Sequence, residues 1–453
     1  MIKMGKICFY NGLVLMCLLY SFTTSAQSTL TLSQAIRNGL ANKKNILAGK
    51  LDITISQLQT KSLYQKYLPQ VSVEYQYLYN PILQTSILPI GVFNPNYPID
   101  ANKSVQFGTK WTQTAGITAT YPLLDLSIRR HISEAKLQER IVGLSQEQSE
   151  YELAYTIAQT YIDVFLDEAK IKSFIADTNR TYISYSLLKD KYDEKRLLKS
   201  DLNKSKINHN NTVQLLSNGI AQLIQDKVYL MFLMGTNDIE KWGFTIDTTF
   251  SIAYTFEDMD GTINIGQLPE MQLLSLQSER TILQEKSEQA KHIPTVGLKG
   301  YLGANQYSNT FDPTAANTWF GQSYVGLNIK IPILFGESTH NNIQQLKIQS
   351  DQLRAKAEDK EKQYEQEAMT AKINLENIQT QLKTQEENIL LSTESIDIFQ
   401  ARFKEGQESA SNLNLEEANL QATKVNYELI KKQRLIYRLD YLKATGQLTI
   451  LWK

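Results

Sequence analysis

The chain contains the stretch Val71-Ser72-Val73-Glu74-Tyr75-Gln76-Tyr77-Leu78-Tyr79, in which apolar or aromatic residues alternate with mostly polar ones. A period of two places neighbouring side chains on opposite faces of the backbone and predicts a β-strand. The alternation returns at about 113–121, 295–304 and 323–331. Each segment has about the length of a tilted strand that crosses a bilayer, ~9–11 residues. A half-buried antiparallel sheet alternates in the same way, so the prediction of membrane-crossing strands rests on the repetition of the pattern in all four segments.

The ten prolines leave two long stretches free, 123–268 and 333–453. Because proline breaks helix interiors, these stretches are free to form very long helices, and they are rich in residues that favour helix. Apolar residues recur at alternating steps of three and four over 141–169 and 368–403. Such stripes bury against partner helices in coiled-coil geometry. Taken alone, they would favour a soluble helical bundle or stalk.

The two halves of the chain repeat one another. The matching segments are Tyr67-Leu68-Pro69-Gln70-Val71 with His292-Ile293-Pro294-Thr295-Val296, Tyr121-Pro122-Leu123-Leu124 with Ile331-Pro332-Ile333-Leu334, and Tyr192-Asp193-Glu194 with Phe403-Lys404-Glu405. The order predicts a tandem duplication of helix, strand, loop, strand and long helical hairpin. The offset changes only within the loop between paired strands, at 80–112 and 306–322, where variable length is expected.

The repeat sets the expected domain boundaries. They are a signal peptide at 1–26, a first repeat at 27–245, a linker or equatorial region at 246–265, and a second repeat at 266–453. The hairpin tips are expected at about 194–201 and 405–412. Each helix between the strands and a tip would span about 110 Å at ~1.5 Å per residue.

The N-terminal residues have the pattern of a secretory signal peptide. Lys3 and Lys6 precede an apolar run that is short of the ~20 residues needed to span a bilayer, and Thr24-Ser25-Ala26 offers a cleavage site. An uncleaved anchor, or lipidation at Cys17, is the alternative. Both cysteines lie in this leader, so the mature chain needs no disulfide. Its net charge near −2 gives no electrostatic case for nucleic acid.

No later segment is a hydrophobic run of ~20 residues, so entry into a membrane would require a closed β-barrel. One chain supplies four strands, which cannot close around a lumen, whereas three copies would supply twelve. The protein is therefore expected to oligomerise in contact with membrane lipid. The lipid-facing side chains are expected to include Val73, Tyr75, Ile117, Leu327 and Ile329.

Residues that carry chemistry are not clustered. His131, His209, His292 and His340 are scattered without metal-like spacing, and no Gly-rich phosphate loop, nucleophile elbow or paired acid cluster is present. We therefore expect no catalytic site, no cofactor and no metal.

The order, spacing and duplication of these segments resemble the TolC-like outer-membrane efflux protein family over nearly the whole mature chain. The motifs are Leu32-Ser33-Gln34-Ala35-Ile36 with Asn42-Lys43, the duplicated prolines beside the strands, Leu268-Pro269-Glu270, and Arg402-Phe403-Lys404-Glu405-Gly406. The resemblance implies a mainly α fold with a membrane β-barrel part. It implies a homotrimer whose twelve-stranded barrel contacts outer-membrane lipid and continues into a periplasmic α-helical tunnel.

The resemblance also implies that the helical tips meet a periplasmic adaptor and, through it, an inner-membrane transporter. The residues expected at this docking tip are Glu194, Lys195, Arg196, Glu405, Gly406 and Gln407. Glycine adopts positive φ without steric cost, as a turn at Gly406 would require. Because Lys195 stands at the matching position, the two tips are expected to differ in shape.

The sequence thus predicts a passive exit duct in the outer membrane with a periplasmic extension, serving tripartite efflux or type I secretion of small molecules or proteins. The alternative is a periplasmic coiled-coil adaptor or structural protein. Adaptors interrupt a small β-rich domain with one helical hairpin, and they would not duplicate long hairpins around membrane-length strand pairs.

Overall fold

The computed structural model describes residues 29–93, 96, 98–236, 244–247, 265–312, 314, 319–333 and 337–452. The leader predicted at 1–26 lies outside these residues, as does most of the linker predicted at 246–265. Among the described residues, no helix has both the length and the apolar character needed to cross a bilayer. The division into two repeats joined by a linker stays a prediction.

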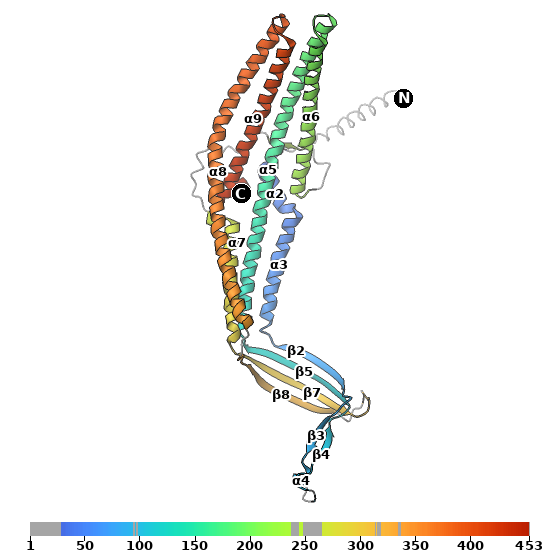
Figure 1. The fold of residues 1–453 in the computed structure, drawn as a ribbon. Coiled ribbons are helices and arrows are strands. Elements are labelled where there is room, and N and C mark those ends of the chain that lie inside the picture. The colour runs from blue at the N-terminus through green and yellow to red at the C-terminus, as the bar shows by residue number, and fades with distance from the viewer. Residues whose placement is uncertain are drawn as a thin grey trace, which may run out of the picture. The chain divides into compact units, whose positions relative to one another are not determined.

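Helices make up most of the chain (Figure 1). They are α2 (Leu32–Asn42), α3 (Lys44–Gln65), α4 (Ile90–Phe93), α5 (Leu126–Asp193), α6 (Lys199–Leu233), α7 (Pro269–Gln289), α8 (Glu337–Lys404) and α9 (Ala410–Ala444), with 3₁₀ turns at Ile265–Gln267, Ala290–His292 and Leu448–Leu451. Both α5 and α8 have 68 residues, and both α6 and α9 have 35. The two long hairpins, α5–α6 and α8–α9, are therefore equal in length.

The described residues form two compact units. The helical unit takes its described residues from 1–50, 145–272 and 358–453, and the sheet unit comprises those of 51–144 and 273–357. The main core of the helical unit lies where α2, α5, α6 and α9 meet, and its largest fully buried side chain is Tyr161. The Tyr161 hydroxyl donates to the Leu30 carbonyl at 2.7 Å. This bond ties α5 to β1 (Thr29–Leu30), which pairs with β6 (Thr245–Ile246).

A second core in the helical unit holds the two hairpins together near their turns. Leu188 of α5 packs with apolar side chains of α8 and α9. These side chains are Ile396, Phe403, Ala410, Leu413 and Leu420. Ile396 and Phe403, one heptad apart, belong to the coiled-coil stripe predicted over 368–403.

The sheet unit contains a four-stranded antiparallel sheet of order β2-β5-β7-β8. Its strands are β2 (Gln70–Tyr79), β5 (Trp111–Leu124), β7 (Thr295–Ser308) and β8 (Trp319–Lys330). Gly116 and Gly303 face each other across β5 and β7, and the Tyr301 ring covers both. A separate two-stranded sheet pairs β3 (Gln84–Leu88) with β4 (Lys103–Phe107). Both β2 and β8 are edge strands with unpaired backbone groups.

Candidate docking tips and membrane-facing sheet

One face of the four-stranded sheet is apolar and exposed. Val73 lies opposite Ile117, while Leu327 and Ile329 lie opposite Leu298 and Val296. The register and the alternation place all five predicted lipid-facing side chains on this face. Val73 is 79% exposed and Leu327 64%. Outside a lipid environment, so large an apolar surface would favour association.

The other face of the sheet is mostly polar. Glu74 lies opposite Gly116, Thr118 opposite Tyr301, and Asn328 opposite Gly297. A strand that alternates apolar and polar residues in this way fits a barrel with lipid outside and water inside. Whether lipid covers the apolar face stays a prediction.

An aromatic cluster, which the sequence analysis did not identify, ends the apolar face. The ring centroids of Tyr77 and Trp111 lie 5.2 Å apart, and those of Tyr79 and Trp111 lie 4.4 Å apart. Phe311, after β7, completes the cluster at 5.0 Å from Trp111. The strand tyrosines were visible in the sequence, but the contribution of Phe311 depends on how the loop folds back. Aromatic residues favour the interface between hydrocarbon and water.

The opposite end of the sheet carries Tyr67, Tyr121 and Ile331, which lie close in sequence to the prolines between strand and helix. Tyr67 and Tyr121 are 37% and 38% exposed, and Ile331 is 61% exposed. Tyrosines exposed to this degree suit an interfacial position or packing at the joint between strand and helix.

The turns of the two long hairpins have the same backbone conformation, so the expectation that the tips differ in shape is wrong. Lys195 has φ 61° and Gly406 has φ 76°. In the first turn, the Arg196 amide donates to the Lys191 carbonyl at 2.8 Å; in the second, the Gln407 amide donates to Arg402 at 2.9 Å. The paired hydrogen bonds that close each helix outweigh the steric cost of a lysine at positive φ.

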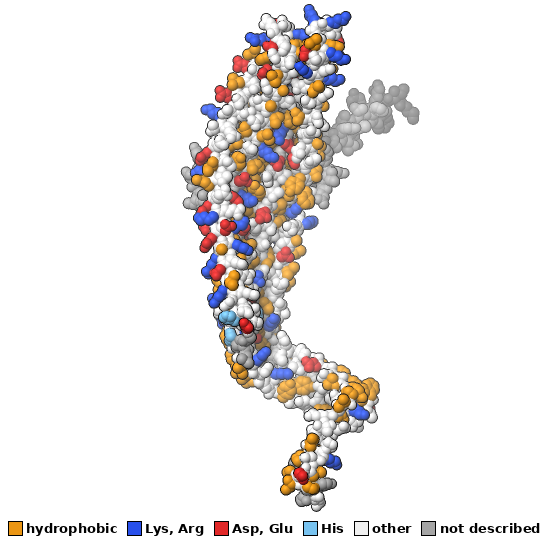
Figure 2. Space-filling model, viewed as in Figure 1, with side chains coloured by type: hydrophobic (Ala, Val, Ile, Leu, Met, Phe, Trp, Pro, Cys, Tyr) orange, Lys and Arg blue, Asp and Glu red, His pale blue; other side chains and the backbone are white. Residues whose placement is uncertain are grey.

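The side chains at the two tips differ in charge. Residues 189–199 contain five basic and three acidic side chains, whereas the matching residues 400–410 contain two of each. Figure 2 shows Lys and Arg side chains gathered at the end of the α5–α6 hairpin. Arg196 is 76% exposed and pairs with Glu194 at 3.3 Å. The structure thus places Glu194, Lys195 and Arg196 in one turn, and Glu405, Gly406 and Gln407 in the other.

We expect Lys195→Gly to stabilise the folded protein by up to about 1 kcal/mol, because glycine removes the steric cost of positive φ. Lys189→Gly, in the exposed last turns of α5, is the matched control and should destabilise by about 1 kcal/mol. Urea unfolding of both variants measures the difference. Equal effects of the two substitutions would show that the Lys195 turn is unstrained.

A polar seam joins the α5–α6 hairpin to α9 behind the tips. Glu417 of α9 is 1% exposed and accepts hydrogen bonds from the Ser184 hydroxyl and, at 3.0 Å, from Asn208. Burial raises the pKa of the Glu417 carboxyl, and the hydrogen bond from Ser184 opposes this shift. Nearby, the Asp177 carboxylate pairs with Lys424 of α9 at 2.9 Å. The sequence analysis did not identify this seam.

The raised pKa of Glu417 predicts a pH dependence of stability. The folded state holds the proton more tightly than the unfolded state, so stability falls as pH rises from the ordinary value of 4.5 through the folded-state pKa. Glu417→Gln should remove this loss, while Glu417→Ala should destabilise by about 1–3 kcal/mol by leaving Ser184 and Asn208 without an acceptor. Thermal unfolding between acid and neutral pH tests this, and a parallel pH profile for wild type and Glu417→Gln would contradict it.

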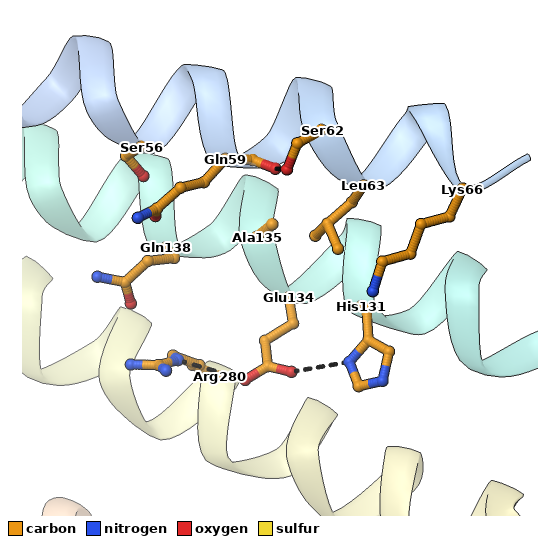
Figure 3. Close-up of a pocket in the computed structure, with 10 residues that line it drawn as sticks. All are labelled: Ser56, Gln59, Ser62, Leu63, Lys66, His131, Glu134, Ala135, Gln138 and Arg280. Atoms are coloured by element: carbon orange, nitrogen blue, oxygen red, sulfur yellow. Dashed lines mark hydrogen bonds and ion pairs between the residues drawn. The ribbon is translucent and has the colours of Figure 1, made fainter. Parts of the chain in front are cut away.

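The sheet unit has a polar cavity of about 380 Å³ between α3, α5 and α7 (Figure 3). Glu134 lies 3.6 Å from Arg280 and 3.8 Å from His131, and it also accepts a hydrogen bond from Gln284 at 2.5 Å. The carboxylate is therefore held between a guanidinium, an imidazole and an amide. These contacts join α5 to α7.

No group of three His, Cys, Asp or Glu side chains within the described part of the chain could hold a metal ion. The histidines have contacts with neighbouring side chains. His131 approaches Glu134, and His209 stacks on Tyr185 with ring centroids 6.3 Å apart.

Comparison with known proteins agrees with this arrangement. Residues 267–447 match the family model described as outer membrane efflux protein. The chain is similar in structure to the outer membrane protein VceC of Vibrio cholerae, with a TM-score of 0.72 and 12% identity over 92% of this chain and 96% of that one. It is also similar to the CmeC outer membrane channel of Campylobacter jejuni, with a TM-score of 0.73 and 14% identity over 92% and 85%. No curated protein sequence matches the chain.

The fold is that of these two solved outer-membrane proteins. The match over residues 267–447 bears out the resemblance to TolC-like efflux proteins. The similarity to the solved structures confirms the predicted mainly α fold with a smaller β part. The trimer, its twelve strands and the docking residues stay predictions.

Proposed function

We propose that the protein is the outer-membrane exit duct of a tripartite efflux or type I secretion system, through which an inner-membrane transporter passes its substrate. The observation that carries this proposal is the four-stranded sheet, which has one exposed apolar face. The outer edges of β2 and β8 have no partner strand among the described residues. Three copies paired edge to edge would supply twelve strands, enough to enclose a lumen. The polar face, with Glu74 and Asn328, would then line the water-filled passage.

The helices support assembly from several copies. In the single chain, α6 exposes Ile207, Val228 and Phe232 by 58%, 51% and 56%, and α8 exposes Met369 and Leu390 by 61% and 69%. Apolar stripes of this kind on long helices bury against other helices. Helices of neighbouring copies would pack against these stripes and form a ring of helices.

The tips suit a protein partner, because both are exposed hairpin turns that hold their shape through backbone hydrogen bonds. A periplasmic adaptor would contact Glu194, Lys195 and Arg196 at one turn and Glu405, Gly406 and Gln407 at the other. The net basic charge of the first turn would favour an acidic patch on the adaptor there. The transporter would be reached only through the adaptor.

The test of the duct is the conductance of the purified protein in a planar bilayer, together with its migration on a gel with and without heating. A duct should require detergent for extraction, migrate as a heat-sensitive oligomer and conduct ions. The competing adaptor or structural protein would be released without detergent and would not conduct.

Docking at the tips is tested by placing a photoreactive residue at Arg196 or Gln407 in cells that make the adaptor and transporter. Glu361, exposed on α8 away from the turn, is the matched control position. Adducts with the adaptor should form from the two tips and not from the control. Adducts from the control alone would move the docking surface along the helices.

A further inference from the structure

The loop between β2 and β5 contains a folded hairpin that has no core of its own. Strands β3 and β4 pair over five residues each, from Gln84↔Phe107 to Leu88↔Lys103, and α4 follows β3. Figure 1 shows this hairpin beyond the end of the four-stranded sheet. No described side chain between 80 and 110 is buried. A two-stranded hairpin is only marginally stable in water, so something outside the loop must cover it.

The uncovered surface of the hairpin is apolar. Val92 and Ile99, near its tip, are 67% and 84% exposed, and Ile87 is 69% exposed. Residues 80–110 contain only three charged side chains, Asp100, Lys103 and Lys110. Figure 2 shows hydrophobic side chains over this part of the molecule. Exposed apolar surface with so little charge indicates a contact with another surface.

The loop between β7 and β8, in contrast, packs on the chain's own sheet. Its Phe311 packs against Tyr77 and Trp111 of the chain's own sheet, with ring centroids 5.6 and 5.0 Å apart. The first loop is the longer one, and no described aromatic or aliphatic side chain at its tip makes a corresponding contact. The described residues of this chain therefore leave the tip side chains Val92 and Ile99 uncovered.

Position favours a second copy over lipid. The hairpin follows Tyr79, which belongs to the aromatic cluster at the sheet end, and it therefore lies past the level where aromatic residues mark the edge of the hydrocarbon. It also continues directly from β2, the edge strand that would pair with β8 of the next copy. Closure of the barrel would bring the hairpins of all copies together around one mouth. Each hairpin would then lie next to the β2–β8 contact between neighbouring copies.

We propose that the β3–β4 hairpins of neighbouring copies pack on one another through Val92 and Ile99 and narrow the outer mouth of the channel. This inference depends on the proposed function, because only a barrel closed by several copies brings the hairpins together. The apolar tips would then replace contacts with water by contacts with each other.

The sequence makes cross-linking a clean test, since both cysteines lie in the leader and the mature chain is expected to have none. Val92→Cys and Ile99→Cys are oxidised in the assembled protein, and Val73→Cys, 79% exposed on the lipid-facing side, is the control. The tip variants should give a reducible dimer in up to about two thirds of the chains, because a threefold axis leaves one thiol of three unpaired. The control should stay monomeric on the denaturing gel.

The outcomes separate this inference from the proposed function. If the unheated protein migrates as an oligomer while neither tip variant cross-links, the contact between hairpins is wrong and the duct stands. If the unheated parent is a monomer without conductance, the proposed function fails and the inference falls with it. Replacing 84–107 by a short Gly-Ser turn should raise single-channel conductance about twofold. If the variant that lacks 84–107 still forms an oligomer and its conductance is unchanged, the proposal that the hairpins narrow the channel mouth is wrong.

Discussion

Leu327→Arg is expected to prevent stable assembly in the membrane. Leu327 is 64% exposed on the apolar face, opposite Leu298 and in the inner part of β8. An arginine on the lipid face of a barrel costs about 2–4 kcal/mol at mid-depth, and every copy would carry the cost. The fraction of protein that migrates as a heat-sensitive oligomer after refolding into vesicles measures the loss.

Asn328→Arg is the matched control, because it adds the same side chain one residue further along the same strand. Asn328 lies opposite Gly297 and belongs to the polar face, where a charge would meet water. This variant should assemble as well as the wild type. Equal assembly of both variants, or a loss only in Asn328→Arg, would reverse the assigned faces.

The strands were the most predictable part of the fold, because their alternation is local. The quoted stretch at 71–79 lies within β2, whose bounds are Gln70–Tyr79. Strand β5 continues past the predicted end to Leu124, through a register shift at Pro122. The β3–β4 hairpin was not predicted, since neither of its short strands alternates regularly.

The shape of the tips was predicted wrongly because residue preference was given too much weight. A lysine at positive φ costs about 1–2 kcal/mol, but backbone hydrogen bonds and packing can exceed that. The Lys191 ammonium donates to the Phe403 carbonyl at 2.7 Å, and Leu197 packs on the apolar cluster between the hairpins. These contacts join residues about 200 positions apart and leave no local trace in the sequence.

The polar seam could not be predicted from the sequence for a related reason. Glu417 falls between Leu413 and Leu420 on α9, and nothing in that pattern distinguishes a buried carboxylate from a solvated one. Its burial depends on Ser184 and Asn208, which two other helices supply. Heptad spacing predicts which helix faces are buried, but the partners that satisfy a polar residue there depend on the tertiary fold.

A second large effect is expected at Gly235, where α6 ends against the turn between α2 and α3. Gly235 has φ 73°, and the Thr236 amide closes the helix by donating to the Met231 carbonyl at 3.1 Å. A Cβ atom on Gly235 would lie 2.6 Å from the Asn42 carbonyl carbon and 2.8 Å from the Lys43 nitrogen. Both neighbours are backbone, so relief would require one helix end to move. Met231 and the residues around it are buried in the main core of the helical unit, which opposes such movement.

We therefore expect Gly235→Ala to destabilise the protein by about 2–4 kcal/mol, the sum of the cost of positive φ and of overpacking. Two other glycines separate these contributions. Gly406→Ala keeps a positive φ of 76° but meets no atom within 4 Å, so it should cost only about 1 kcal/mol. Gly143→Ala, inside α5 with nothing within 4 Å, should stabilise by up to about 1 kcal/mol. Urea midpoints of the three variants test the order, and equal losses at Gly235 and Gly406 would mean that the α2–α3 turn yields freely and that the close packing at Gly235 contributes nothing to stability.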